Sequence, residues 1–253
     1  MGMLDGKVVL VTGAGHGIGS ATAHHLHDEG ASVIATARSQ DDAEVMAKSF
    51  DDENWVARQL DVTDEQAVAE TVQFITDSFG RLDGIVNNAA VLVPNDVATA
   101  TVDEYNFIFD VNVKGVFLGA KYAIPALLAA GGGSIVNIGS INSLAAEKQL
   151  ALYTASKGAV SMLTKAIALD YGAAGIRANT LCPGFVDTKI NVPHYNRLGG
   201  REALDAGLAD FQPIARDIAP VEIGYSVSFL LSDRSKAITG TDFVVDGGVL
   251  CKA

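Results

Sequence analysis

The sequence predicts an α/β protein of one domain, in which a doubly wound parallel β-sheet carries helices on both faces. Three observations lead to this fold class. Short runs of β-branched residues alternate along the chain with longer stretches of helical period. Several of the short runs are apolar almost throughout, as strands buried on both faces of a sheet are. Glycine supplies 26 of the 253 residues, and glycines stand at the ends of the apolar runs, where a chain turns.

Turn signals divide the chain into seven expected strands and six expected helices. The expected strands cover residues 7–11, 32–36, 55–60, 84–87, 134–138, 177–181 and 242–245. The expected helices lie near residues 18–29, 41–49, 64–79, 101–130, 151–174 and 220–232. Asp64 and Glu65 place negative charge at the positive end of the third helix. Gly80 and Gly175 are expected to end the third and the fifth helix.

No repeat, low-complexity tract or Pro/Ser-rich linker divides the chain, so residues 1–253 are expected to form a single domain. The segment 188–220 differs from the rest because it has few strand signals and mixed polarity. It also contains the pair Gly199-Gly200. These features predict a mobile flap over a binding site.

Charge and composition exclude several kinds of protein. The chain carries 30 acidic and 18 basic residues, and its formal net charge of −12 repels nucleic-acid phosphates and anionic lipid. We therefore expect no nucleic-acid partner and no membrane partner. The richest apolar stretch, residues 122–130, contains Pro125 and is far shorter than the roughly 18 residues that a membrane span needs.

Cysteine and histidine usage favours a reduced, cytoplasmic protein without a metal. Cys182 and Cys251 lack CxxC spacing and are interpreted as packing cysteines. The first residues lack the basic stretch and the apolar core of a secretory signal. His24, His25 and His27 are predicted to share a polar, solvated helix face, so no metal site is expected.

The first expected strand runs into a glycine-rich turn and then into a helix. Residues 12–19 read Thr-Gly-Ala-Gly-His-Gly-Ile-Gly. Glycines in such a turn let backbone N–H groups approach a pyrophosphate, and the helix N-terminus stabilises its negative charge. Glycines also occur in ordinary turns between a strand and a helix, so the loop alone leaves a dinucleotide site and a structural turn both open.

The spacing Thr-Gly-x-x-x-Gly-x-Gly resembles that of the short-chain dehydrogenase/reductase family, in its single-domain branch. Further segments resemble the family in the right order along nearly the whole chain: Leu60-Asp61-Val62-Thr63, Asn87-Asn88-Ala89-Ala90, Pro183-Gly184-Phe185-Val186-Asp187-Thr188 and Asp246-Gly247-Gly248. The resemblance implies a Rossmann-like fold. It also implies an NAD(P)(H)-dependent oxidoreductase, an alcohol dehydrogenase or carbonyl reductase, that interconverts a secondary alcohol and a ketone by hydride transfer.

Four residues match the catalytic residues of the family. Tyr153 and Lys157 form its Tyr-x-x-x-Lys pattern, and residues four apart share one face of a helix. The resemblance makes Tyr153 the acid and base, and we expect the Lys157 ammonium and the nicotinamide ring to lower its pKa. Ser140 would bond the substrate oxygen, and its spacing to Tyr153 favours it over Ser143. Asn112 would hold a water in a proton relay; a buried asparagine that satisfies a backbone group is the alternative.

The same matches imply which residues bind the cofactor. They lie in the glycine loop, at the ends of the second to fourth strands, on the catalytic helix and in the turn after the sixth strand. They are Gly13, Gly15, His16, Gly17, Ile18, Gly19, Arg38, Asp61, Val62, Asn88, Ala89, Ala90, Tyr153, Lys157, Pro183, Gly184, Val186 and Thr188. Ala90 is a small departure, because many relatives have glycine at this position.

The end of the second strand bears on the choice between NAD and NADP. An acidic residue there would bind the ribose 2′-hydroxyl of NAD, but the family's position for it holds Ala37. Arg38 follows, and its guanidinium suits a phosphate. His16 stands where NADP-using relatives often carry Arg or Lys. The sequence therefore favours NADP(H), with NAD(H) as the alternative because Asp41 and Asp42 are close in sequence.

The expected substrate is a small alcohol or ketone that contacts Ser140, Asn142 and Tyr153. Asn142 and Glu147 favour a hydroxylated or polar carbonyl compound, whereas the apolar neighbours fit an alicyclic or aromatic ketone equally well. His194 is interpreted as a surface residue of a mobile loop. The expected pocket wall consists of residues 141–145, Glu147, Leu150, residues 92–94, His194, Tyr195 and Phe211.

Two further expectations concern assembly and an alternative function. Members of the family commonly pair two long helices and form tetramers, and the expected helices at 101–130 and 151–174 are long and rich in Ala, Leu and Val. A homotetramer is therefore expected by resemblance. The alternative function is a catalytically silent regulator that senses a dinucleotide; such proteins typically lack the tyrosine or the lysine, both of which are present here.

Overall fold

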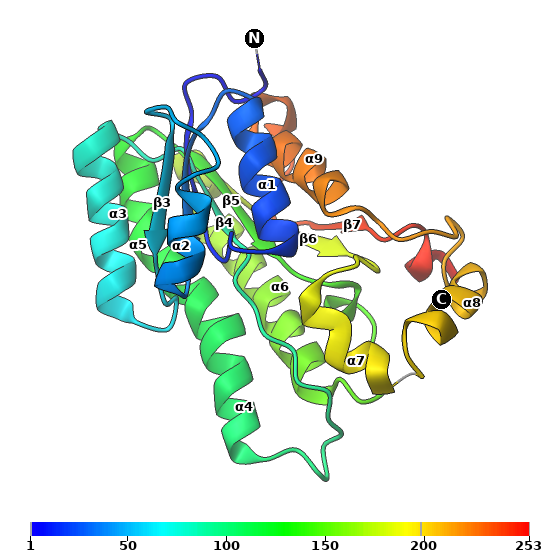
Figure 1. The fold of residues 1–253 in the computed structure, drawn as a ribbon. Helices are drawn as coiled ribbons and strands as arrows, with labels where there is room; N and C mark the ends of the chain where they lie inside the picture. Colours follow the sequence, from blue (N-terminus) through cyan, green and yellow to red (C-terminus); the bar gives the residue numbers. More distant parts are fainter. Residues whose placement is uncertain (1, 198, 253) are drawn as a thin grey trace.

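The computed structural model describes residues 2–197 and 199–252, which form a three-layer α/β structure (Figure 1). Its centre is a seven-stranded sheet in the order β3-β2-β1-β4-β5-β6-β7, with all neighbouring strands parallel. The strands are β1 (Val8–Val11), β2 (Ser32–Ala37), β3 (Trp55–Gln59), β4 (Gly84–Asn87), β5 (Gly133–Ile138), β6 (Ile176–Pro183) and β7 (Asp242–Val245). The predicted fold class and all seven predicted strands are confirmed.

Helices cover both faces of the sheet (Figure 1). Helices α1 (Gly17–Asp28), α2 (Gln40–Met46) and α9 (Pro220–Leu231) share one hydrophobic core. Helices α3 (Glu65–Phe79), α5 (Gly115–Ala129) and α6 (Ala151–Tyr171) share a second core on the opposite face. The predicted ends of α3 and of the α6 region are confirmed, since Gly80 and Gly175 have φ of 73° and 85°, in the left-handed region.

The central strand β1 contributes to both cores because its side chains alternate between the two faces. Val9 and Val11 belong to the first core, and Val8 and Leu10 belong to the second. The four side chains are at most 5% exposed. The uniformly apolar run that predicts this strand therefore reflects a helix layer on each face.

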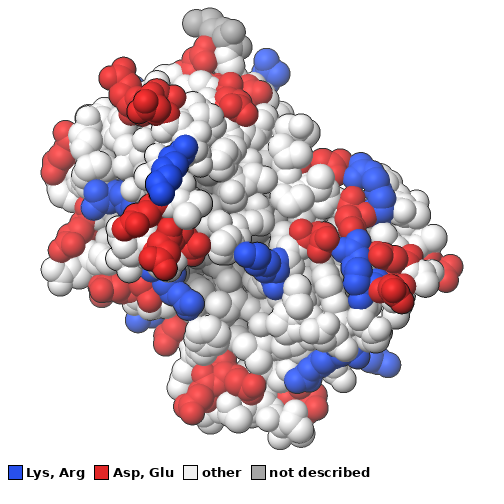
Figure 2. Space-filling model, viewed as in Figure 1, with Lys and Arg blue, Asp and Glu red and all other residues white. Residues whose placement is uncertain are grey.

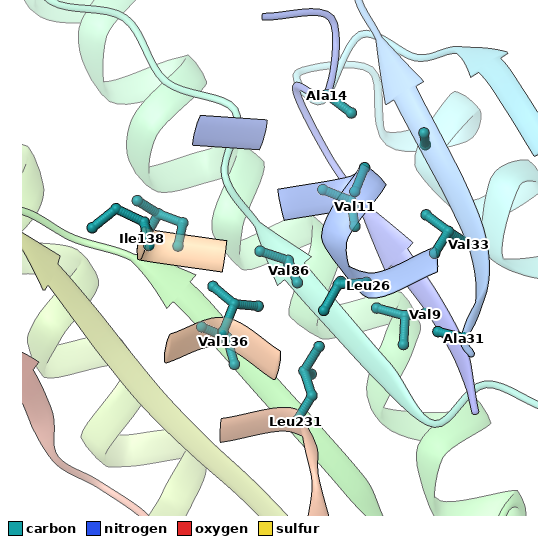
Figure 3. Packing of buried hydrophobic residues seen from close by; sticks show 14 of the residues in the cluster. Val9, Val11, Ala14, Leu26, Ala31, Val33, Val86, Val136, Ile138 and Leu231 are labelled. Atoms are coloured by element: carbon teal, nitrogen blue, oxygen red, sulfur yellow. The ribbon is translucent and has the colours of Figure 1, made fainter. Parts of the chain in front are cut away.

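In the first core, side chains of neighbouring strands meet those of two helices that are far apart in the sequence. Figure 3 shows Val9, Val86 and Val136 of the sheet near Leu26 of α1 and Leu231 of α9, all in one cluster. This packing joins the N-terminal and C-terminal parts of the chain across one sheet face. It places the start of α1 directly beyond the end of β1.

The predicted helix 101–130 is interrupted, and this expectation was wrong in detail. The structure has α4 (Val102–Phe109), a π-helical turn over Asp110–Lys114, and then α5. Asn112 lies in this turn with 1% exposure, and its side chain bonds backbone groups of Val91 and the Ser156 hydroxyl. A π-turn inserts one extra residue into a helix. Here it coincides with the tertiary hydrogen bonds of Asn112, and no helix-breaking residue marks its position in the sequence.

The combined helical stretch Val102–Ala129 is long and apolar enough to cross a membrane, with 28 residues and a mean hydropathy of 1.2 over its best window. Charged residues interrupt the stretch, so no uninterrupted apolar run of the sequence predicts it. Half of that window is buried inside the protein, where α5 packs on α3, β4 and β5. The stretch therefore serves as a core helix of this fold.

The segment 188–220 contains two helices that the sequence analysis did not predict. They are α7 (Val192–Arg197) and α8 (Arg201–Phe211). Both project beyond the carboxyl ends of β6 and β7 (Figure 1). The helices are short, and few of their side chains are buried, so their apolar spacing is too weak to identify them in the sequence.

The histidines of α1 are not solvated as predicted. The His27 ring stacks on Phe50 with 3.8 Å between centroids, and its Nε2 lies 3.0 Å from Asp52. His24 packs against both Phe50 and Trp55 at 5.4 and 5.2 Å. These rings cover the outer end of the first core because imidazole has an apolar body as well as polar nitrogens.

Acidic residues outnumber basic residues in this chain, 30 to 18. Figure 2 shows acidic side chains around the edge of the viewed face, with Lys and Arg in small separate groups among them. On this face, the described residues form no continuous basic stripe of the kind that follows a nucleic-acid backbone. The middle of the face, around the hollow that leads into the molecule, consists mostly of uncharged side chains.

Candidate active site

A cavity of about 740 Å³ lies at the carboxyl edge of the sheet. The strand order reverses between β1 and β4, and crevices at such a reversal are the usual ligand sites of open parallel sheets. The cavity is bordered by the glycine loop, the ends of β2 to β6, helix α6 and the segment that contains α7 and α8. Its size and elongated border suit a dinucleotide together with a small second molecule.

The glycine loop forms the floor of one end of this cavity, and its backbone leaves no room for side chains. Gly13 and Gly17 have φ of 66° and 56°. A Cβ on Gly13 would lie 2.7 Å from Ala89 Cα, and one on Gly17 would lie 2.9 Å from Thr188 Cγ2. A Cβ on Gly15 would lie 3.3 Å from Ala37 Cβ. The loop is thus a narrow cradle of bare backbone, as close approach to a pyrophosphate requires.

Helix α1 starts at Gly17 directly after this loop. Its N-cap residue, His16, makes no side-chain hydrogen bond to the first turn, and the first turn contains no acidic residue. Uncapped N–H groups and the helix dipole together favour an anion at this point. The residues present therefore fit the pyrophosphate of a nicotinamide dinucleotide, which would rest on Gly15, Gly17 and Ile18.

Asn88 fastens the glycine loop to the end of β4. Its Nδ2 donates to the carbonyl oxygens of Thr12 and Gly13 at 3.0 and 2.9 Å. The Thr12 hydroxyl in turn accepts from the backbone N–H of Asn88 and of Ala89 at 3.0 and 3.2 Å. Asn88, Ala89 and Ala90 all line the cavity, as the resemblance implies.

Gly19 differs from the other glycines of the loop, since it does not line the cavity. A Cβ there would collide with Asn88 Nδ2 and the Gly13 carbonyl oxygen. Its place is behind the loop, where α1 approaches the sheet closely. Gly19 is therefore a packing residue in this structure, and its expected cofactor contact is not among the cavity contacts.

The far end of the cavity is bordered by the ends of β2 and β3. Asp61 and Val62 line it, as the resemblance implies for an adenine-contacting corner. Arg38 and Asp42 line it as well, so this corner presents a cation and an anion together. Asp42 is held in place because the Ser39 hydroxyl donates to its Oδ2 at 2.6 Å, and its Oδ1 lies 3.4 Å from His16 Nε2.

Tyr153 and Lys157 come from the first two turns of α6 and both line the cavity. Their side chains face the same way, with Lys157 Nζ 5.6 Å from the Tyr153 ring centroid. Lys157 is 3% exposed and donates to the Ile138 carbonyl oxygen at 2.8 Å. The predicted pair thus meets at the end of β5, one helical turn apart.

The structure does not show the expected lowering of the Tyr153 pKa, and the share expected from the nicotinamide ring stays a prediction. Burial raises the pKa of Tyr153 to about 12, although hydrogen bonding from Ser140 lowers it in part and the Glu147 charge raises it further. Burial also lowers the pKa of Lys157 to about 8. Each group is desolvated, and desolvation penalises the charged form of both the acid and the base. The Lys157 ammonium donates to the Ile138 carbonyl oxygen and lies 5.6 Å from the centroid of the Tyr153 ring.

Ser140 follows β5 and lines the same cavity. Its hydroxyl donates to Asn142 Oδ1 at 3.1 Å and accepts from the Asn142 backbone N–H at 3.1 Å. The neighbouring Ser143 does not line the cavity, and its hydroxyl accepts from the Ser140 backbone N–H. The structure therefore places Ser140, and not Ser143, beside Tyr153.

Asn112 lies outside the cavity lining. Its Oδ1 accepts from the Val91 N–H at 2.8 Å, and its Nδ2 donates to the Val91 carbonyl oxygen and the Ser156 hydroxyl at 2.9 and 3.0 Å. The side chain therefore satisfies a backbone pair, which is the alternative interpretation of this residue. It also links Val91, a cavity residue, to the helix turn between Tyr153 and Lys157.

The turn after β6, which by resemblance would face the nicotinamide, borders the cavity. Pro183, Gly184, Val186 and Thr188 line the cavity. Gly184 is obligatory there, because a Cβ would lie 2.6 Å from Asp246 Cα. The last strand thereby fixes the turn that covers the catalytic side of the cavity.

The expected substrate wall is found in part. The wall residues that line the cavity are Ile141, Asn142, Glu147, Leu150, Leu92, His194 and Phe211. The expected wall residues outside its lining are Ser143, Leu144, Ala145, Val93, Pro94 and Tyr195. Lining residues that the sequence analysis missed include Phe185, Lys189, Gly207 and Leu208. The last two belong to α8, a helix without a clear sequence signal.

His194 is not a surface residue of a loop, which corrects the interpretation from sequence. It lies on α7 with 4% exposure, and its Nε2 is 2.8 Å from Glu147 Oε1. The two residues are 47 positions apart, so only the fold brings them together. Among the described residues, no group of His, Cys, Asp and Glu side chains could hold a metal ion.

The fold and the cavity define a dinucleotide-binding oxidoreductase. A family model described as enoyl-(acyl carrier protein) reductase matches residues 13–250. The NADP-dependent (R)-specific alcohol dehydrogenase of Lentilactobacillus kefiri is 36% identical, with 97% of both chains covered. The meso-2,3-butanediol dehydrogenase of Serratia marcescens is 35% identical, with 96% of this chain and 94% of that protein covered.

A solved structure is also similar to this chain over nearly its whole length. The gluconate 5-dehydrogenase of Burkholderia cenocepacia J2315, in complex with NADP and tartrate, superposes with a TM-score of 0.90 at 33% identity and covers 98% of this chain and 96% of its own. The present chain belongs to the short-chain dehydrogenase/reductase family. It is a nicotinamide-nucleotide-dependent oxidoreductase of secondary alcohols and ketones. The similarity to named dehydrogenases favours an enzyme over a silent regulator.

The cost of burying the Lys157 ammonium leads to a prediction about stability. Its pKa falls from 10.5 to about 8 on folding, which corresponds to about 3 kcal/mol. Below pH 8 both folded and unfolded chains are protonated and the folded state bears this full cost; between pH 8 and 10.5 the folded chain releases its proton first and the cost disappears. We expect the stability of Lys157→Met relative to wild type to be greatest at pH 7 and to decline towards pH 10.

Urea unfolding of the protein without cofactor at pH 7, 8, 9 and 10 measures this difference. Lys48→Met, at an exposed position, is the matched control, and its difference from wild type should stay constant. A Lys157→Met difference that does not change over this pH range would contradict the assignment of a buried ammonium.

Proposed function

We propose that Tyr153 is the acid and base of this oxidoreductase, that Ser140 binds the reacting oxygen of the substrate and that Lys157 positions and charges the site. The observation that carries the proposal is the meeting of all three side chains in one cavity with the glycine loop. When bound, the nicotinamide would accept a hydride in alcohol oxidation and supply one in ketone reduction.

The proposed roles follow from the contacts of each side chain. The Ser140 hydroxyl can rotate from Asn142 to donate to the substrate oxygen and stabilise developing negative charge. The phenol of Tyr153 would take the alcohol proton in oxidation and return it to the ketone oxygen in reduction. Because burial holds its pKa at about 12, positive charge near the phenol is needed for the phenolate to form near neutral pH. The oxidised nicotinamide ring carries such a charge.

We assign Asn112 a positioning role in the same proposal. Its amide joins Val91 on the cavity wall to Ser156 on the catalytic helix. Ser156 in turn donates to the Tyr153 carbonyl oxygen at 2.7 Å, so the network reaches the backbone of the catalytic tyrosine. A water relay through Asn112 stays a prediction.

We also propose that residues 1–253 form a single domain and that the segment near residues 188–220 is a flap over the substrate. Residues of α7 and α8 line the cavity, among them His194, Gly207, Leu208 and Phe211. Arg201, at the start of α8, forms ion pairs with Asp187, Asp205 and Asp217. The pairs with Asp205 and Asp217 lie within the flap, whereas the pair with Asp187 would hold the flap against the turn after β6.

The role of Tyr153 can be tested by removing its hydroxyl. We expect Tyr153→Phe to lower kcat at least 1000-fold, since the variant keeps the ring but loses the transferable proton. Binding of reduced nicotinamide nucleotide, followed by its fluorescence, should stay within a few-fold of wild type. Tyr225→Phe, at a position 54% exposed, is the matched control and should have full activity. Turnover by Tyr153→Phe close to that of wild type would refute the role.

We further propose that NADP(H) is the preferred cofactor. Ala37 leaves the end of β2 without an acid, while Arg38 at the cavity edge offers a guanidinium to a 2′-phosphate. A relative named as NADP-dependent and a structural neighbour bound to NADP support this preference. Asp42 opposes it, because its carboxylate shares the corner and can accept a hydrogen bond from the ribose of NAD.

The opposed charges of this corner predict opposite effects of two substitutions. We expect Arg38→Ala to lower the ratio of kcat/KM for NADP over NAD by about 10- to 100-fold, because a charge-assisted bond is lost. Asp42→Asn should raise the same ratio, because like-charge repulsion of the phosphate is removed. Arg234→Ala, at an exposed position that does not line the cavity, is the control and should leave the ratio unchanged. An unchanged ratio in Arg38→Ala would remove the case for NADP(H).

We propose a homotetramer built on the long helices. Large apolar side chains are exposed on α4, α5 and α6, including Phe107, Phe117, Met162 and Leu169 at 44%, 48%, 64% and 85%. Covering these side chains by a second copy would bury apolar surface that a lone chain leaves in water. Members of the family commonly assemble through such helices.

Light scattering tests this assembly and should give a particle of four chains. Leu169→Glu should shift it to smaller species, because an unpaired carboxylate in an apolar interface is costly. Val97→Glu, at a position 80% exposed outside the long helices, should leave the tetramer intact. A single-chain mass for the wild type at micromolar concentration would overturn the proposal.

A cytoplasmic location completes the proposal. Both cysteines are free, Cys182 buried and Cys251 exposed, which suits a reducing compartment. The nicotinamide nucleotides on which this family depends are available in the same compartment. The proposed small-molecule partner is an alcohol or a ketone.

A further inference from the structure

A group of polar side chains lies beside the catalytic residues and has no part in the mechanism above. We call Asn142, Glu147 and His194 the polar corner. Glu147 is its centre, with Oε1 2.8 Å from His194 Nε2 and Oε2 3.4 Å from Asn142 Nδ2. Asn142 also accepts from the Ser140 hydroxyl at 3.1 Å, so the corner is bonded directly to the proposed substrate-binding serine.

Within the polar corner, Glu147 is the residue that faces the open cavity. Its side chain is 34% exposed, whereas the His194 side chain is 6% exposed and Asn142 is 6% exposed. All three border the cavity. The two buried members each contact one oxygen of the carboxylate, and a carboxylate has further lone pairs that can accept a hydrogen bond from a molecule in the cavity.

Many of the side chains that line the cavity are apolar. Ile141, Leu150, Leu208 and Phe211 are among them and offer no side-chain hydrogen bond, while Lys189 and Asn191 also line the cavity. A carboxylate in such surroundings strongly prefers a hydrogen-bond donor and disfavours a second negative charge. The charge also reaches the reacting group, since Glu147 contributes to the raised pKa of Tyr153.

We propose that Glu147 determines substrate specificity by accepting a hydrogen bond from a second hydroxyl group of the substrate. The preferred substrates are then uncharged hydroxyketones and the corresponding diols, with the second hydroxyl close to the reacting carbon. Keto acids are disfavoured because their carboxylate would face that of Glu147. His194 is a positioning residue that fixes the Glu147 carboxylate. This inference rests on the proposed function, because it presumes that the carbonyl oxygen is bound at Ser140 and Tyr153.

The expected size of the preference follows from the type of bond. A hydrogen bond to a charged group contributes about 1.5–3 kcal/mol, which corresponds to about 10- to 100-fold in kcat/KM. Wild-type enzyme should therefore reduce 3-hydroxybutan-2-one about 10- to 100-fold more efficiently than butan-2-one. The two compounds differ only in the hydroxyl next to the carbonyl group.

Glu147→Gln tests the role of the charge, because it keeps the shape and a partner for His194. We expect the ratio of kcat/KM for 3-hydroxybutan-2-one over butan-2-one to fall at least fivefold. The ratio for 2-oxobutanoate over butan-2-one should rise about tenfold, since the repelling charge is gone. Glu53→Gln, at an exposed position in the turn before β3, is the matched control and should leave both ratios unchanged.

The ratios separate specificity from folding defects. A poorly folded variant loses activity towards all three compounds alike, whereas a gain for 2-oxobutanoate relative to butan-2-one cannot arise from instability. Ratios that stay at the wild-type values in Glu147→Gln would overturn the inference. So would a wild-type enzyme that reduces butan-2-one as efficiently as the hydroxyketone.

The same assays distinguish this inference from the proposed function. Nucleotide-dependent reduction of the plain ketone by wild type, lost in Tyr153→Phe, supports the proposed function whatever the ratios are. Absence of turnover with every ketone, with nucleotide bound, would overturn the proposed function and the inference together. Turnover without a hydroxyl preference would overturn the inference alone.

Discussion

The close approach of the glycine loop to the end of β4 is the constraint on which the cavity depends. Gly13 lies so near Ala89 that any Cβ would overlap it, and Asn88 bonds the carbonyl oxygens of Thr12 and Gly13. These contacts join the two strands on either side of the reversal in strand order. They fix the direction in which α1 leaves the sheet, and with it the N–H groups available to a pyrophosphate. Cofactor binding is therefore built into the central packing of the fold.

The catalytic side of the cavity works against stability. Tyr153 and Lys157 are both buried, and burial shifts each pKa towards the neutral form. The fold accepts this cost because the network through Ser156 and Asn112 holds the helix turn that carries them. At neutral pH burial leaves the Lys157 ammonium charged but keeps the Tyr153 phenol neutral. Ionisation of the phenol would therefore depend on positive charge that binds beside it, which couples its chemistry to an occupied cofactor cradle.

The sequence predicted most of the fold and the cofactor half of the site, because both rest on local patterns. The strand β1 and its glycine loop are contiguous, and Tyr153 and Lys157 are one turn apart. The rest depends on contacts between distant parts of the chain. The π-turn at Asn112 accompanies bonds to Val91 and Ser156, and the burial of His194 depends on Glu147, 47 residues away. No pattern along the chain encodes such pairings.

The difference between the two halves of the site also explains why family resemblance identifies the chemistry before the substrate. The reacting groups are held by the sheet and by α6, while the substrate wall is completed by α7 and α8. Glu147 lies between these halves, since it meets His194 on α7 and its charge raises the pKa of Tyr153. A hydroxyl that donates to Glu147 would spread its negative charge and weaken that effect on the phenol. Recognition of the substrate's second oxygen would thus favour ionisation of the tyrosine that reacts with the first.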